Sequence, residues 1–312
     1  NDFFLIGGNQ TLNAGSMRLG YRVPSLQYPF TPDSSSLLGG DFLAEIFGQV
    51  SAQAINQYEF SRVGTAFNYK VPVLEKINYQ IRLRFFDQSL NNVDQGSIIS
   101  PEDEASRFFS IINTTYTFDY RDDSYNPTSG LLFEIKTNSS SEIIGSDYNF
   151  LGGTAQLSLY EKLSNRIVIA QNFRGGGLVP FSKTDTIPIS ERYFLGGRDS
   201  IRGFSLFSVG PRSLSGSVTG GDKFLQSNTE LQLSTTETSR LVLFVDAAKV
   251  ELDFPGSFIP SQENQRDIFI SPGFGYRYIT PIGPISLELG FPLNKRSDES
   301  FLKIFFGIGG AF

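Results

Sequence analysis

The sequence predicts an all-β fold, a transmembrane antiparallel β-barrel that occupies residues 1–312 as a single domain. Three observations support this prediction: apolar and polar residues alternate along many segments, most of these segments reach ten residues or more, and short connections take turns with long polar ones. A tilted strand needs about 9–11 residues to cross a bilayer, whereas strands of soluble proteins average about 5–6. The segment length therefore favours a membrane barrel over a soluble β-sandwich.

The alternation places apolar side chains on one face of each segment and polar ones on the other, because successive strand residues point to opposite faces. In residues 78–85 the two faces are Tyr79, Ile81, Leu83, Phe85 and Asn78, Gln80, Arg82, Arg84. The pattern predicts thirteen or fourteen strands, near 3–6, 11–23, 41–54, 59–71, 78–88, 107–120, 130–139, 148–162, 166–178, 224–235, 241–250, 268–279, 284–291 and 301–311. A membrane barrel needs only its outward face to be apolar, so inward arginines are compatible with it.

The connections between the predicted strands fall into two kinds. Some are tight, such as 161–165 and 281–284, and others are long and polar, at 24–40, 88–106, 251–266 and above all 179–223. Short turns on one rim and long loops on the other are expected of outer-membrane barrels. A loop as long as 179–223 is either functional or disordered, and its glycines and aromatic residues favour function.

The composition excludes several classes of protein. The 312 residues contain no Cys and no His, which rules out a disulfide framework, a Ser-His-Asp triad and a zinc site built on thiolate or imidazole. The net charge of −6 gives no basic patch for a nucleic acid. No apolar run reaches the ~18 residues of a transmembrane helix. We expect no enzyme, cofactor, metal site or nucleic-acid partner, and a barrel phospholipase is excluded because it would depend on His.

The C-terminal segment ends on an aromatic residue that shares a face with earlier apolar positions. Its apolar face consists of Ile304, Phe306 and Ile308, with Phe312 at the end of the chain. This segment resembles the terminal sorting signal of bacterial outer-membrane barrels. In physical terms it is an edge strand that an assembly factor can pair with before the barrel closes.

The most specific motif lies in the longest loop, within residues 191–204. Gly196 and Gly197 precede a four-residue run of Ile201, Arg202, Gly203 and Phe204. This arrangement resembles the signature of the BamA/TamA superfamily. The resemblance implies a bacterial outer-membrane barrel of 16 strands in which this loop folds into the lumen and its arginine meets acidic residues on the inner wall.

Further stretches agree with the order of motifs in that superfamily. Residues 119–122 followed by 127–130 resemble its mid-barrel strand, turn and strand, and 280–284 leading into 287–293 resembles its penultimate hairpin. The likeness is clear over about residues 107–312. By strand order it identifies Glu230 and Asp246 as the acidic partners of Arg202. The alternation agrees, because both carboxylates share parity with polar rather than apolar neighbours.

The resemblance implies an insertase that folds and inserts other β-barrel proteins through a lateral seam between its first and last strands. Its partners would be unfolded outer-membrane proteins, outer-membrane lipids, and accessory lipoproteins or periplasmic subunits. We expect residues 1–312 to form the barrel alone, without the periplasmic POTRA-type domains of the superfamily. Two alternatives remain: a two-partner-secretion transporter of the same superfamily, and a passive porin whose pore is lined by Arg18, Arg22, Arg62, Arg82 and Arg84.

Overall fold

A computed structural model describes residues 2–6, 14–23, 41–53, 58–91, 106–212, 216–253, 268–280, 283–296 and 299–308. These residues form fourteen strands and two short 3-10 helices, η2 (Glu142–Ile144) and η3 (Ile189–Glu191). The first seven strands are β1 (Asp2–Ile6), β2 (Ala14–Val23), β3 (Asp41–Gln53), β4 (Tyr58–Leu74), β5 (Ile77–Asn91), β6 (Arg107–Asp119) and β7 (Gly130–Ser140). The others are β8 (Phe150–Ser164), β9 (Ile167–Pro180), β10 (Lys223–Thr236), β11 (Ser239–Glu251), β12 (Phe269–Thr280), β13 (Gly283–Gly290) and β14 (Lys303–Ile308).

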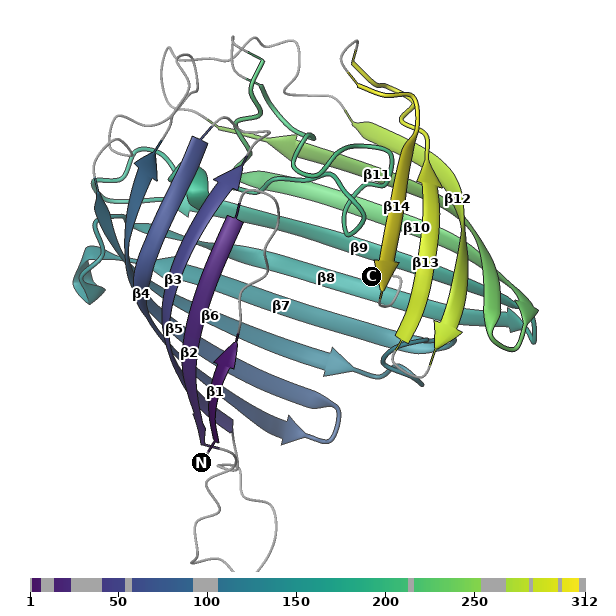
Figure 1. The fold of residues 1–312 in the computed structure, drawn as a ribbon, viewed down its shortest axis with the longest axis horizontal. Coiled ribbons are helices and arrows are strands. Elements are labelled where there is room, and N and C mark those ends of the chain that lie inside the picture. Colours follow the sequence, from purple (N-terminus) through teal and green to yellow (C-terminus); the bar gives the residue numbers. More distant parts are fainter. Residues whose placement is uncertain are drawn as a thin grey trace, which may run out of the picture. The chain divides into compact units, whose positions relative to one another are not determined.

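Each strand is hydrogen-bonded to the next strand of the sequence, in the order β1 to β14 (Figure 1). The ladders described residue by residue are antiparallel, as in β10–β11, where Asn228 lies opposite Asp246. The predicted all-β antiparallel fold and the strand count read from the alternation are thus confirmed. Sixteen strands stays a family expectation, because part of the chain lies outside the described residues. No helix among the described residues is long and apolar enough to cross a membrane.

The strand ends differ from the prediction by a few residues where alternation fades. The predicted turn at 161–165 is wrong: β8 runs on to Ser164 and pairs into a two-residue turn before β9. β5 likewise extends to Asn91, which shortens the following connection. Polar residues can prolong a hairpin ladder beyond the apolar stretch, because backbone hydrogen bonds do not depend on side-chain polarity.

The chain divides into two compact units, described separately below. Unit 1 comprises residues 1–118, 134–153 and 178–192, and unit 2 comprises 119–133, 154–177 and 193–312. β6, β7, β8 and β9 each contribute residues to both units, β6 only its last residue, Asp119, to unit 2.

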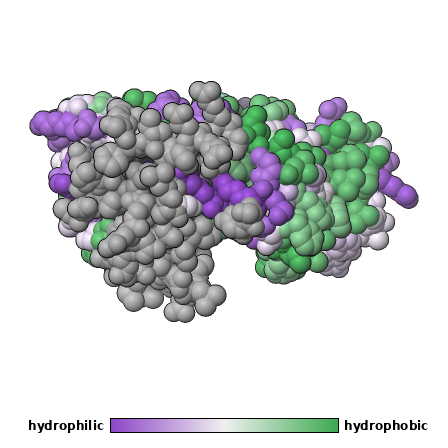
Figure 2. Space-filling view, turned by 90° about the horizontal axis from the view of Figure 1, so that it is seen from above, coloured by the Kyte–Doolittle hydropathy of each residue, from purple (hydrophilic) through white to green (hydrophobic). Residues whose placement is uncertain are grey.

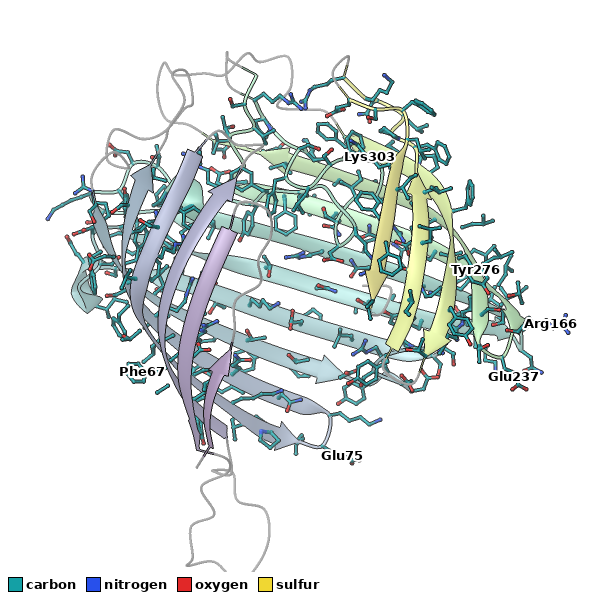
Figure 3. The ribbon with its side chains drawn as sticks, viewed as in Figure 1. Phe67, Glu75, Arg166, Glu237, Tyr276 and Lys303 are labelled. Carbon is teal, nitrogen blue, oxygen red and sulfur yellow. The ribbon has the colours of Figure 1, made fainter. Side chains whose placement is uncertain are left out.

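The strands of unit 2 have an apolar outer face and a polar inner face. On β11, the outward-facing Leu243 and Val245 are each 49% exposed, whereas the inward-facing Asp246 is completely buried. Figure 2 shows hydrophobic side chains gathered at the right of the view, on the side where Figure 1 labels β10–β13. Tyr276, labelled in Figure 3, is an exposed member of this outer face on β12. An exposed apolar face with a buried charged interior is the opposite of a soluble β-sheet and suits a hydrocarbon environment.

Tight turns join alternate strands of unit 2. Arg166 and Glu237 mark the β8–β9 and β10–β11 turns, close together in Figure 3. The longer β6–β7 turn is organised by Asp122, which accepts hydrogen bonds from the backbone of Asp123, Thr128 and Ser129 and from the Thr128 hydroxyl. The Asp122-Asp123 pair is therefore a turn element.

Candidate functional site

The long connection between β9 and β10 packs against the inner face of unit 2 in residues 193–212 and 216–222. Short antiparallel bridges join Tyr193 to Gly221 and Leu195 to Val209, so the segment doubles back on itself. Its apolar side chains enter a buried cluster: Leu195, Ile201, Phe204 and Val209 of the loop with Phe224, Ala248, Val250 and Phe269 of the strands. Full burial of one such large side chain contributes roughly 1.5–3 kcal/mol, which is sufficient to hold an otherwise irregular segment in place.

Arg202 lies at the tip of this loop and makes a paired contact with a strand carboxylate. Its Nε and Nη2 donate to the two oxygens of Asp246, both at 2.8 Å, and its backbone N–H donates to Asp246 at 2.8 Å. Its Nη1 donates to Glu230 at 2.5 Å. Its guanidinium also lies 3.7 Å from the ring centre of Phe244. The structure therefore brings together the three residues that the sequence analysis grouped. The planar guanidinium of Arg202 matches the geometry of the Asp246 carboxylate, so two parallel hydrogen bonds form.

Two further charged residues complete the cluster and were not singled out in the sequence. Arg277 of β12 donates to Glu230 at 3.2 and 3.3 Å and to Glu288 of β13 at 3.0 Å. Glu288 also lies 3.5 Å from Nη1 of Arg202. The alternation did place Glu288 on the inner face, but parity alone does not say which inward charges meet across strands.

The cluster is sealed from solvent, which decides its energetics. The side chains of Glu230 and Asp246 are 0% exposed and that of Arg202 is 3% exposed. Burial lowers the pKa of Arg202, but Asp246, Glu230 and Glu288 outweigh it and raise that pKa above its usual value. Such a network is costly to desolvate and costly to break, because removing one partner leaves a buried charge uncompensated. The buried network therefore fixes the position of the loop. Its contribution to that position is larger than its net contribution to the free energy of unfolding.

Gly203 is required by the close approach of the loop to β12. Its φ of +137° is a conformation that residues with a Cβ rarely adopt. A Cβ there would lie 2.0 Å from the hydroxyl oxygen of Ser271, which donates to the carbonyl of Arg202 at 2.6 Å. The glycine after the arginine thus lets the Arg202 carbonyl reach its strand partner.

The other motif residues shape the loop that carries Arg202. The backbone N–H of Gly197 donates to the carbonyl of Phe204 at 3.0 Å, which closes the intervening turn. The N–H of Gly196 donates to Ser200 at 3.2 Å. Ile201 and Phe204 flank Arg202 and are both buried, and Phe204 meets Phe269 edge to face at 5.3 Å. The motif therefore combines a turn, two apolar anchors and one charged anchor.

A second ion-pair cluster holds the start of the same loop within unit 1, at η3. Glu191 accepts from Arg62 of β4 at 2.8 Å and lies 3.7 Å from Arg84 of β5. Gln88 donates to Ser190 at 2.9 Å and accepts from Arg62 at 2.6 Å. Sequence reasoning placed both arginines on the inner face but as pore-lining charges. The structure pairs them with a loop carboxylate, and it pairs Arg82 with Glu45 at 2.8 Å.

The described part of the terminal strand has the predicted facial pattern. Ile304, Phe306 and Ile308 of β14 are 63%, 69% and 59% exposed, on the outer face. Phe312 and the side chains of Arg18 and Arg22 lie outside the described residues. Among the described residues, no group of acidic side chains is arranged to hold a metal ion.

An exposed apolar outer face, a charged inner face and a loop pinned to that inner face define the class of protein: an outer-membrane β-barrel. The chain belongs to the Omp85 superfamily, because the model of the "Omp85 superfamily domain" matches residues 4–312. The match and the fold place the protein in a bacterial outer membrane.

Two curated relatives are informative. The chain is 25% identical over 280 residues to the "Outer membrane protein assembly factor BamA" of Nitratidesulfovibrio vulgaris, covering 88% of this chain and 34% of that protein. It is 26% identical over 236 residues to the "Sorting and assembly machinery component 50 homolog" of Mus musculus, covering 68% of this chain and 49% of that one. The chain thus spans from about a third to a half of the length of these relatives.

Two solved structures share the fold. BamA from Haemophilus ducreyi, solved without POTRA domains 1–3, matches with a TM-score of 0.80 and 21% identity over 97% of this chain and 63% of that one. CdiB from Acinetobacter baumannii matches with a TM-score of 0.56 and 14% identity over 95% of this chain and 50% of that one. These likenesses establish the barrel fold of the chain.

Proposed function

We propose that this chain is the membrane barrel of an insertase that helps other β-barrel proteins to fold into the outer membrane. The likeness to a BamA assembly factor over 88% of the chain carries the proposal. The mouse relative is also named as part of an assembly machinery. The substrates would be unfolded outer-membrane proteins in contact with outer-membrane lipids, and accessory lipoproteins or periplasmic subunits would deliver them.

The order of the strands supports a lateral seam between the first and last strands. Among the described residues, β1 and β14 are the two end strands of the hydrogen-bonded order, so each is paired along one edge in that order. An end strand leaves the backbone groups of its other edge available for pairing. The backbone groups of a free edge can then pair with an incoming strand. No covalent chemistry is required.

The loop supports an assembly role over a passive pore. A porin needs an open lumen, whereas here the loop is fixed to the inner face of unit 2 by a buried ion network. The arginines Arg62, Arg82 and Arg84, which could have formed an anion pathway, each lie within ion-pair distance of a carboxylate. Paired guanidiniums attract passing anions weakly, because their charge is compensated locally.

The test is assisted folding in vitro. The full-length protein that contains this barrel is reconstituted in lipid vesicles, and an unfolded eight-stranded outer-membrane protein is diluted in from urea. We expect faster appearance of the heat-modifiable folded band than in protein-free vesicles. A rate equal to that of empty vesicles would contradict the proposal.

A reversible lock tests the seam itself. The chain has no Cys, so cysteines placed singly in β1 and β14 can be screened for a disulfide without background. The oxidised pair should abolish assisted folding and the reduced pair should restore it. Each single-cysteine variant is the matched control.

The transporter alternative has its own readout. It is favoured by the likeness to CdiB, at a TM-score of 0.56 against 0.80 for BamA. A transporter would carry an exported polypeptide into the vesicle lumen, where it is protected from added protease, and would leave barrel folding unchanged.

A further inference from the structure

Arg198 lies in the same loop as Arg202 but faces a different part of unit 2. Its Nη2 donates to the hydroxyl of Ser286 on β13 at 3.3 Å, and its Nε lies 4.0 Å from Glu288 on the same strand. Ser286 is the cross-strand partner of Gly307 on β14. The guanidinium therefore lies over the ladder that joins the last two strands.

Gly307 is the position on β14 over which Arg198 passes. A Cβ built at Gly307 would lie 2.2 Å from Nε, 2.3 Å from Cζ and 2.7 Å from Cδ of Arg198. No side chain fits there while Arg198 keeps its place. The atoms that a Cβ at position 307 would meet belong to the flexible side chain of Arg198. Even a methyl group there would therefore displace the guanidinium and leave the backbone of β14 in place.

The negative charges of the buried cluster attract the guanidinium of Arg198 and hold it in this position. Among the described residues, three carboxylates, Glu230, Asp246 and Glu288, contact the sealed guanidiniums of Arg202 and Arg277. The carboxylates outnumber these two guanidiniums by one in a buried region, where charges interact strongly. Arg198, whose side chain is 20% exposed, supplies a third guanidinium beside Glu288. Asp199 lies 3.6 Å from Arg198 but is 93% exposed and competes weakly.

We propose that Arg198 is a positioning residue that ties the loop to the terminal hairpin β13–β14 and fixes the inner side of β14. Two contacts make up this tie. The guanidinium is attracted to Ser286 and Glu288, and it packs against the backbone of Gly307, which has no side chain to displace it. Resting on the proposed insertase function, the tie sets the position in which the last strand offers its edge. A change in the loop is thereby passed to β14 through Arg198, which shares Glu288 with the Arg202 cluster.

A double-mutant cycle with hydrogen exchange tests this tie without any assembly assay. The purified full-length protein in vesicles is compared as wild type, Arg198→Ala, Gly307→Ala and the double variant, with exchange followed at the β14 amides. Each single variant should exchange roughly tenfold faster, which is the worth of one hydrogen bond to a charged group. The double variant should exchange no faster than either single variant, because Gly307→Ala acts only by displacing Arg198.

Two further variants serve as controls. Arg174→Ala removes another arginine of unit 2, one whose guanidinium lies over the ring of Phe224 at 5.5 Å, and should leave β14 exchange unchanged. Arg198→Lys keeps the charge and should restore part of the protection. If Gly307→Ala accelerates exchange equally with and without Arg198, or if Arg198→Ala has no effect on β14, the tie is disproved.

The assembly readout separates this inference from the proposed function. If the protein assists folding, Arg198→Ala should slow assisted folding while the barrel itself stays heat-modifiable. If the protein does not assist folding at all, the exchange result still decides whether Arg198 holds β14. Exchange that ignores Arg198 in an active insertase would overturn the tie alone.

Discussion

The two ion-pair clusters on the long loop hold it by opposite arrangements of charge. In unit 2 one loop arginine is surrounded by strand carboxylates and sealed, with Glu230 and Asp246 at 0% exposure. In unit 1 one loop carboxylate, Glu191, meets two strand arginines whose side chains are 10% and 21% exposed. Solvent reaches the second cluster but not the first. Sealed charges give a fixed position that is costly to lose, and partly exposed ones give a contact that salt can weaken.

The largest expected effect is the loss of the sealed arginine. Arg202→Ala leaves Asp246 and Glu230 buried without their partner, so we expect the free energy of unfolding to fall by about 3–5 kcal/mol. Urea unfolding in lipid vesicles, followed by heat-modifiability, measures this. Arg174→Ala is the matched arginine control and should change stability by less than about 1 kcal/mol. An Arg202→Ala barrel as stable as wild type would mean that the sealed cluster does not pin the loop.

The second effect tests whether the loop can approach the strand without glycine. Gly203→Ala combines a φ of +137° with a Cβ 2.0 Å from Ser271, and should cost about 2–3 kcal/mol. Gly216→Ala is the control, because Gly216 has a φ of +88° and nothing within 4 Å of the added Cβ. The difference between the two variants isolates the collision from the backbone strain. Equal losses would show that the collision with β12 contributes nothing.

The third effect sharpens the contrast between the clusters through salt. Glu191→Gln removes the carboxylate between Arg62 and Arg84 and should cost about 1–2 kcal/mol at low ionic strength. At 1 M salt the Debye length is about 3 Å, so this difference should shrink, whereas the Arg202→Ala difference should hardly change. Glu45→Gln, which removes the partner of Arg82 away from the loop, is the control for general charge loss. A Glu191→Gln effect insensitive to salt would mean that both clusters are sealed alike.

The sequence predicted part of the sealed cluster around Arg202, but it did not predict the second ion-pair cluster around Glu191. Alternation fixes which face each side chain takes, so Glu230 and Asp246 could be placed inward from their neighbours alone. It does not fix which inward residues meet, and Arg277 and Glu288 join Arg202 only through strand order and register. Glu191 is 129 residues from Arg62 along the chain, a pairing that no local pattern encodes. The fold followed from local periodicity, whereas the site needed tertiary contacts.

The smallest effect comes from a carboxylate that is held by backbone rather than by a guanidinium. Burial raises the pKa of Asp122, but hydrogen bonds from Thr128, Ser129 and Asp123 outweigh it and lower that pKa from 3.8 to about 2. The folded protein thus favours the ionised form, so the contribution is complete above the unfolded pKa of 3.8 and is lost as pH falls from there to about 2. Asp122→Asn should therefore lower stability at neutral pH, by less than about 1 kcal/mol because the group is exposed.

The pH dependence of that difference is the measurement that completes the comparison. Wild type and Asp122→Asn should converge as pH falls from 4 to 2, within the window set by the two pKa values. Arg202→Ala should remain less stable than wild type at pH 4. The residues that hold the sealed cluster do not contact Asp122, so protonation of Asp122 does not affect the cluster. A wild type that keeps its full advantage over Asp122→Asn at pH 2 would show that neutral hydrogen bonds, and not the charge, organise the turn. Ionisation would then matter only where solvent is excluded, as it is around Arg202.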